Sequence, residues 1–137
     1  MLYMGDTMEN NNNLLIVEDE KAFRMLLTAF FRRLNYFVIA VESAEEALEK
    51  VEKECCNIGI VDLKLPGMSG VELVKVLKKK NPVGIFYAIT GFSSLFELAE
   101  TREAGFDDYF CKPLKLHELQ HAVEEAEKRI ERWQRRI

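Results

Sequence analysis

Five polar residues of this sequence each stand at or just after the end of a short apolar run: Glu18, Asp19, Asp62, Thr90 and Lys112. If the three carboxylates lie close together they repel one another, and a single ammonium does not neutralise them. Mg²⁺ would, because it prefers oxygen ligands from carboxylates, water and phosphate. With a phosphoryl donor on that metal, Thr90 and Lys112 could hold phosphoryl oxygens, and ionised Asp62 is a competent nucleophile for an acyl phosphate.

Each of these residues also has an ordinary structural explanation. Glu18 and Asp19 could cap a helix, where acidic side chains favour the helix dipole. Asp62 could open the turn LKLPGMSG, Thr90 could be a plain strand exit, and Lys112 could be a solvated surface side chain. For each residue taken alone, the structural explanation is the simpler one. Because these polar residues all fall at the ends of four strands, however, a shared site is favoured.

The apolar runs predict the strands that position these residues. LLIV, YFVIAV, NIGIV, GIFYAIT and the weaker DDYFC lie at residues 14–17, 36–41, 57–61, 84–90 and 107–111. Runs that are apolar on both faces suit parallel strands buried between layers of helices. The carboxyl ends of parallel strands meet at one edge of a sheet, where active crevices form.

Helical patterns fill the segments between the runs. Apolar residues recur at helical spacing from Phe23 to Leu34, and Asn81-Pro82 and Gly105 predict helix ends. Ser-x-x-Glu pairs, which form capping boxes, predict three helix starts at Ser43, Ser69 and Ser94. Strand and helix alternate five times, which predicts an α/β fold with a parallel sheet, right-handed crossovers and helices on both faces.

The composition limits the classes of function. A chain of 137 residues fits one domain, and 48% apolar with 31% charged residues is typical of a soluble globular protein. The net charge of −4 argues against direct contact with nucleic acid, and no apolar run reaches the length that spans a membrane. The three cysteines have no metal-type spacing and no secretory signal precedes them, so we expect reduced thiols in the cytoplasm.

Four segments together identify a family. IVEDE, IVDLKLPGMSG, AITG and YFCKP, in this order and spacing, resemble the receiver domain of two-component response regulators. The resemblance implies a doubly wound, flavodoxin-like (βα)5 fold with a five-stranded parallel sheet in the order 2-1-3-4-5. It divides the chain into an N-terminal tail (1–13), a receiver domain (14–128) and a C-terminal extension of the last helix (129–137).

The resemblance also implies the function of the acidic residues. Asp62 would accept a phosphoryl group from a partner sensor histidine kinase or phosphotransfer protein, and the chain would then control a downstream output protein or domain. Asp19 and Asp62 would bind Mg²⁺ directly, Glu18 would act mainly through water, and the backbone carbonyl of Lys64 would be a further ligand.

Three more residues would complete the switch by the same resemblance. Thr90 and Lys112 would contact the phosphoryl group, and Tyr109 matches the aromatic switch position. In that family the Thr moves toward the phosphate and leaves space for the ring to turn inward, a two-state repacking. A half-buried aromatic on an edge strand is the alternative explanation for Tyr109. The bond before Pro113 is usually cis in the family.

This sequence departs from the family pattern at three positions. Glu18 replaces the more frequent Asp, which lengthens the reach of the carboxylate and keeps its charge. Lys64 and Phe92 lie two residues beyond Asp62 and Thr90, where side chains tune self-dephosphorylation by admitting or orienting water. Phe92 offers no polar group, so we expect slow autodephosphorylation.

The segment HELQH, from His117 to His121, matches the His-Glu-x-x-His pattern of zinc proteases. The chain contains only these two histidines, and no third ligand follows by pattern. We therefore interpret the match as chance on the solvated face of the last helix.

The apolar residues of that helix are more informative. They alternate at spacings of three and four and form a heptad seam: Leu116, Leu119, Val123, Ala126, Ile130, Trp133 and Ile137. One interpretation is an amphipathic helix whose first half packs on the sheet. The other is an overhang that pairs with a second chain as a homodimer, or that leads into an output domain.

Three other functions stay open at this point. A haloacid-dehalogenase-type phosphatase also uses an Asp nucleophile and Mg²⁺, but it requires a second Asp where this chain has Lys64. A pseudo-receiver would bind partners without being phosphorylated, although Asp62, Thr90 and Lys112 are intact. The chain could also be a fragment of a larger regulator or hybrid kinase.

Overall fold

The computed structural model describes residues 13–91 and 94–135. One parallel sheet of five strands runs in the order β2-β1-β3-β4-β5, which confirms the predicted fold and strand order. The strands are β1 (Asn13–Val17), β2 (Phe37–Val41), β3 (Ile58–Asp62), β4 (Ile85–Thr90) and β5 (Asp108–Cys111). The pairing register places Val17 beside both Val41 and Val61, so the carboxyl ends of the central strands are level.

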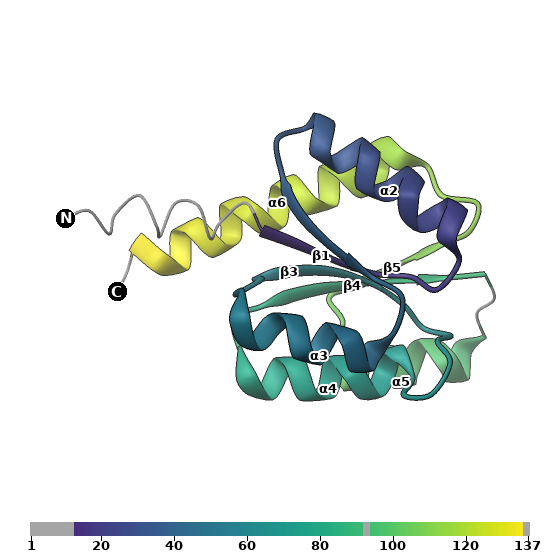
Figure 1. Ribbon diagram of the computed structural model, residues 1–137. Helices are drawn as coiled ribbons and strands as arrows, with labels where there is room; N and C mark the ends of the chain where they lie inside the picture. Colours follow the sequence, from purple (N-terminus) through teal and green to yellow (C-terminus); the bar gives the residue numbers. More distant parts are fainter. Residues whose placement is uncertain (1–12, 92–93, 136–137) are drawn as a thin grey trace.

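Helices cover both faces of the sheet. They are α2 (Lys21–Arg33), α3 (Ala44–Lys53), α4 (Gly70–Lys80), α5 (Leu95–Ala104) and α6 (Leu116–Arg135). Helices α2 and α6 lie on one face, and α3, α4 and α5 lie on the other (Figure 1). None of the helices in the described ranges is long and apolar enough to cross a membrane.

The predicted helix boundaries follow from local hydrogen bonding. The Ser43, Ser69 and Ser94 hydroxyl oxygens accept from the backbone N–H three residues on, at 3.1, 3.1 and 3.2 Å. At Ser69 the capping box is complete, because the Glu72 side chain also accepts from the Ser69 N–H. Helix α4 ends against Asn81, and α5 ends at Gly105, whose φ of 113° is left-handed and favours glycine.

Two hydrophobic cores lie on the two faces of the sheet. Leu15, Val17, Val61, Leu73 and Phe86 belong to the core under α3, α4 and α5. The core under α2 and α6 contains Leu14, Ile16, Leu27, Phe31 and Leu119. Consecutive residues of β1 therefore point to opposite cores, which is why LLIV is apolar throughout.

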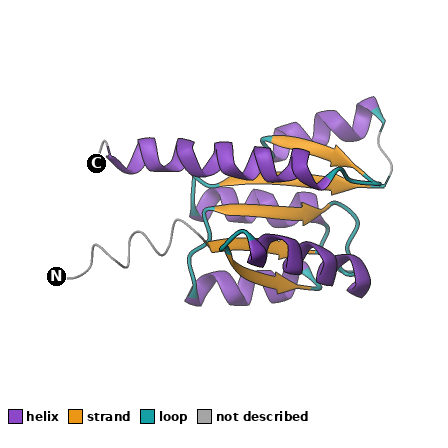
Figure 2. Ribbon diagram, turned by 90° about the horizontal axis from the view of Figure 1, so that it is seen from above, coloured by secondary structure: helices purple, strands orange, loops and turns teal. Residues whose placement is uncertain are grey.

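Helix α6 uses most of its heptad seam inside the domain. Leu119, Val123, Ala126 and Ile130 are buried against the sheet, whereas the side chain of Trp133 is 51% exposed. The helix continues to Arg135 and projects beyond the sheet (Figure 2). The first interpretation of the seam therefore holds as far as Ile130, and Ile137 lies outside the described residues. Of the predicted tail, only Asn13 is described, and it begins β1.

Candidate functional site

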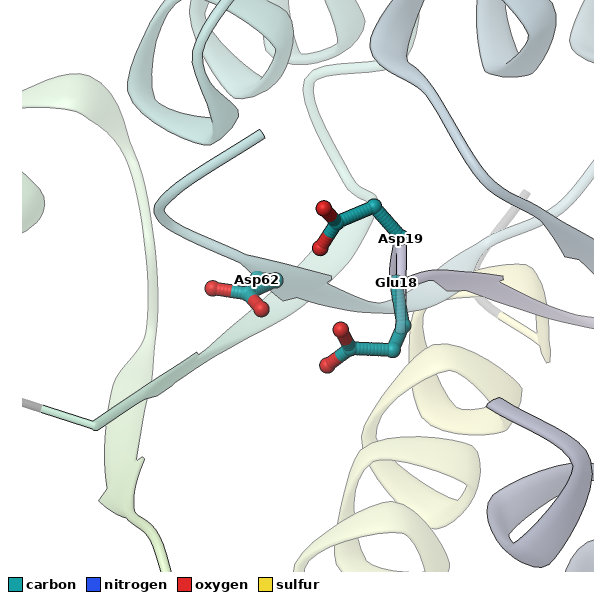
Figure 3. Close-up of side chains that lie close together, drawn as sticks. All are labelled: Glu18, Asp19 and Asp62. Atoms are coloured by element: carbon teal, nitrogen blue, oxygen red, sulfur yellow. The ribbon is translucent and has the colours of Figure 1, made fainter. Parts of the chain in front are cut away.

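Three carboxylates gather at the carboxyl ends of β1 and β3. Asp62 is the last residue of β3, and Glu18 and Asp19 directly follow β1. One oxygen from each side chain lies within 4.8 Å of the others, and Figure 3 shows the three carboxylates drawn together. The structure thus brings together the acidic residues that the sequence predicted to meet.

Glu18 is completely buried, which is unusual for a carboxylate. Its Oε2 accepts from the Glu20 N–H at 2.9 Å, and its Oε1 lies 3.2 Å from the Lys112 ammonium nitrogen. That ion pair is not aligned as a hydrogen bond, and no other described group donates to Oε1. Burial raises the pKa of Glu18 to about 7, and the negative charge of Asp62 acts in the same direction.

Asp62 is buried and held through both carboxylate oxygens. Oδ1 accepts from the Lys64 N–H at 3.0 Å, and Oδ2 accepts from the Lys112 ammonium at 3.1 Å. The start of α4 passes close to the end of β3, and a Cβ on Gly70 would clash with the Asp62 carbonyl oxygen. Only glycine fits at this position, and its small size lets the loop that contains Lys64 pack closely against the end of the strand.

Lys112 stands between the two buried carboxylates. Burial disfavours its charged form, but the hydrogen bond and charge of Asp62, together with Glu18, outweigh burial and raise the pKa of Lys112. The Lys112 N–H donates to the Thr90 carbonyl at 2.8 Å, so buried Thr90 and Lys112 lie at the same edge of the sheet. The Lys112-Pro113 peptide bond is cis, as the resemblance implied.

Two further predicted residues are described, Tyr109 on β5 and Lys64 in the loop after β3. Tyr109 pairs with Ala88 across β4 and β5, and its side chain is 39% exposed. Lys64 lies in the loop between β3 and α4, two residues after Asp62. Phe92, on which the prediction of slow autodephosphorylation depends, lies outside the described residues.

The donor set fits a hard divalent cation. The three gathered groups are all oxygen ligands, and the buried Glu18 Oε1 has no aligned donor among the described residues. Within residues 13–91 and 94–135, this is the single cluster of three His, Cys, Asp or Glu side chains close enough to share a metal. His117 and His121 are both exposed on α6.

Three residues that the sequence did not single out contact the site or the loop that follows β3. The Phe23 ring lies under the Lys112 ammonium, with 5.0 Å from the nitrogen to the ring centre. Arg24 donates to the carbonyls of Glu18 and Asp19 at 2.9 and 3.3 Å. Glu45 accepts from the Met68 N–H at 3.0 Å and so ties α3 to the β3–α4 loop. The sequence did offer one signal for Arg24, because it is a charged residue in the first helical turn after Asp19.

Comparisons with known proteins show the family of the chain. Residues 14–124 match the family model of the response regulator receiver domain. The chain is 31% identical over 113 residues to sporulation initiation phosphotransferase F of Bacillus subtilis. The matched region covers 82% of this chain and 91% of that protein. It is 34% identical over 112 residues to a cyclic di-GMP phosphodiesterase of Thermotoga maritima, but spans only 30% of that protein's length.

Solved structures show the same fold. A CheY-like receiver domain protein from Methanospirillum hungatei superposes with a TM-score of 0.78 at 31% identity, over 85% of this chain and 97% of that one. The receiver domain of the Francisella response regulator 1452 gives a TM-score of 0.80 at 24% identity, over 87% and 98% of the two chains.

Proposed function

Because the chain belongs to the response regulator receiver domain family, we propose that it accepts a phosphoryl group on Asp62 and switches conformation in response. One observation carries the assignment to Asp62. Its buried carboxylate lies between the Lys112 ammonium and the Lys64 N–H, at 3.1 and 3.0 Å, beside the carboxylates of Glu18 and Asp19. A buried carboxylate with fixed donors on both oxygens is positioned to act as a nucleophile.

The acidic cluster supports Mg²⁺ as the cofactor. Asp19 and Asp62 would bind the ion directly, Glu18 mainly through water, and the Lys64 carbonyl would add a ligand. The bound ion would offset repulsion among the carboxylates and neutralise charge on the phosphoryl oxygens. The rest of the chemistry depends on the chain's own side chains.

The transfer itself needs one nucleophile and two oxygen-binding groups. A carboxylate oxygen of Asp62 attacks phosphorus, and the bond from phosphorus to the donor's imidazole nitrogen, or to the carboxyl oxygen of acetyl phosphate, breaks. The electron pair of that bond leaves with the donor, so no proton has to leave Asp62. Meanwhile the Lys112 ammonium and the Thr90 hydroxyl hold the phosphoryl oxygens. The chain is then modified itself and does not turn over a separate substrate.

The switch would involve Thr90 and Tyr109. Thr90 lies buried at the end of β4, and the side chain of Tyr109 on the neighbouring strand is partly exposed. If the Thr90 hydroxyl moves toward the phosphoryl group, it leaves space into which the Tyr109 ring can turn. The surface formed by α5 and β5 would then differ between the two states, which is what an output partner could detect.

The partners follow from this chemistry. We propose a sensor histidine kinase or phosphotransfer protein as donor and a separate or attached output protein or domain as receiver of the signal. The donor must approach Asp62. Met25 and Leu26 are exposed on α2, which starts two residues after Asp19, and we propose them as contacts for the donor. Cytoplasmic location and absence of direct contact with nucleic acid stay predictions.

Homodimerisation through the last helix also stays a prediction. The structure limits which residues of α6 are left to form such an interface. The seam residues up to Ile130 are buried on the chain's own sheet. A dimer through α6 would therefore have to use Trp133 and the residues that follow it.

Intact mass spectrometry tests the function. After incubation with Mg²⁺ and acetyl phosphate we expect one added phosphoryl group, absent from Asp62→Asn and from a sample with EDTA. Asp108→Asn, which removes an exposed carboxylate on β5, should still gain the group. If no donor, including phosphorylated histidine proteins, adds mass to the wild type, the chain is a pseudo-receiver, and Mg²⁺ titration would then show whether the acidic pocket binds metal.

A further inference from the structure

Among the described residues, three side chains lie close to the Lys112 ammonium, and two of them are carboxylates that the proposed function assigns to phosphorylation and metal binding. It lies 3.1 Å from Asp62 Oδ2, 3.2 Å from Glu18 Oε1 and 5.0 Å from the centre of the Phe23 ring. When Asp62 becomes an acyl phosphate, the ammonium must leave the carboxylate and pair with a phosphoryl oxygen. The aromatic ring is the neighbour that neither reaction nor metal binding changes.

Phe23 is fixed to the site from two directions. Its ring packs against the core under α2 and α6, so the helix face and the core hold it in place. The next residue, Arg24, donates to the backbone carbonyls of Glu18 and Asp19 at 2.9 and 3.3 Å. The first turn of α2 is therefore tied to the loop that carries the acidic residues, and the ring keeps its position relative to them.

The Lys112 side chain, in contrast to the Phe23 ring, is not fixed in one position by packing. Its side chain is 28% exposed and has four rotatable carbon–carbon bonds, so its ammonium can swing toward solvent whenever it exchanges one anionic partner for another. An ammonium over the face of an aromatic ring is attracted by the ring quadrupole. That attraction does not depend on which oxygen the ammonium pairs with.

The other aromatic residue at a comparable place on α2 behaves differently. Phe30 is also partly buried against the same core, but its ring packs edge-to-face on the Phe31 ring, with 5.2 Å between the ring centres. Filling the core therefore explains Phe30, whereas it does not explain why the face of Phe23 is turned to a charged group.

We propose that Phe23 is a positioning residue that holds the Lys112 ammonium in place while its anionic partner changes from Asp62 to the phosphoryl group. The inference rests on the proposed function, because it concerns the step in which Asp62 is phosphorylated. Loss of the ring should slow the transfer without preventing it, since Lys112 itself remains.

The test compares side chains of similar shape at position 23. Replacement of Phe23 by 3,4,5-trifluorophenylalanine keeps the ring but removes the negative charge from its face, and Phe23→Leu removes the ring. We expect both to lower the rate constant for phosphorylation of Asp62 by acetyl phosphate at saturating Mg²⁺ by about two- to fivefold. Phe30→Leu, the matched control on the same helix, should leave the rate constant unchanged. A wild-type rate in the trifluoro variant overturns the proposal.

A second measurement needs no phosphoryl donor. In NMR spectra of the wild type, the Lys112 Hε protons should be shifted upfield by the ring current of Phe23. That shift should disappear in Phe23→Leu and persist in Phe30→Leu. If the wild type is not phosphorylated by any donor, the proposed function fails while this shift still reports on Phe23. Lys112 Hε protons at the same position in wild type and Phe23→Leu would contradict the positioning role.

Discussion

Glu18 shows how one additional methylene group changes an acidic site. The longer side chain is completely buried, and its two oxygens reach the Glu20 N–H and the Lys112 ammonium. An Asp at this position would be one methylene group shorter and would reach less far from the same backbone. Because burial raises the pKa of Glu18 to about 7, its charge in the metal-free protein depends on pH near neutrality.

This pKa predicts that Mg²⁺ binding depends on pH. The metal-free protein keeps a proton on Glu18 between about pH 4.5 and 7 that the unfolded chain has lost, so this group stabilises the fold less as pH rises. Mg²⁺ favours the charged carboxylate and should displace that proton. We expect the Mg²⁺ affinity to increase about tenfold from pH 6 to pH 8, as measured by calorimetry.

Glu18→Gln provides the control for that titration. Glutamine carries no proton that a metal could displace, so the affinity of this variant should be weaker and nearly independent of pH. An equally pH-independent affinity in the wild type would show that Glu18 is already ionised at pH 6.

At the scale of elements, the site depends on contacts between loops that follow different strands. The first turn of α3 provides Glu45, whose carboxylate accepts from Met68 N–H in the β3–α4 loop at 3.0 Å. Gly67, the residue before Met68, has a φ of +76°, and a Cβ on it would lie 2.8 Å from Glu45 Oε2. This hydrogen bond lowers the pKa of Glu45 and fixes the loop that presents the Lys64 carbonyl.

Loosening that loop should weaken metal binding more than it weakens the fold. For Glu45→Ala we expect the Mg²⁺ affinity to fall about two- to fivefold, because one charge-assisted hydrogen bond to the loop is lost. Glu49→Ala, an exposed position one turn further along α3, is the matched control and should bind Mg²⁺ like the wild type. Equal affinities in both variants would mean that the loop keeps its conformation without Glu45.

At the scale of the whole molecule, the acidic pocket and the exposed end of α6 lie at opposite ends of the sheet. The pocket is at the carboxyl ends of the strands, and α6 projects past their amino ends (Figure 2). A partner bound at Trp133 would therefore leave the path to Asp62 open. Phosphorylation and association through α6 can occur on the same molecule.

A homodimer through the end of α6 gives a specific prediction for sedimentation. The weight-average mass should rise with concentration, and Trp133→Ala should abolish the rise while the melting temperature stays nearly the same, because Trp133 is 51% exposed. Ile130→Ala is the contrasting variant, since Ile130 is buried and its truncation should cost about 2–5 kcal/mol of stability. A monomer at every concentration, with and without phosphorylation, would remove the dimer.

The sequence alone determined the order of elements, the strand ends and the identity of the acidic residues. Strands buried on both faces must be apolar throughout, and serine caps and Gly105 mark helix limits by local hydrogen bonding, so these features are readable without a structure. The convergence of Glu18, Asp62 and Lys112 was also predictable, because parallel strands end at one edge.

Only the tertiary structure decided which partners these groups take. Phe23 reads as an ordinary core position, since its spacing along α2 is the same whether its ring faces a methyl group or an ammonium. Likewise, the α6 seam has one pattern whether it packs on a sheet or on a second helix, and only the fold shows that Ile130 is buried within the chain. Periodicity states which face is apolar, whereas the contact depends on where the chain brings distant residues together.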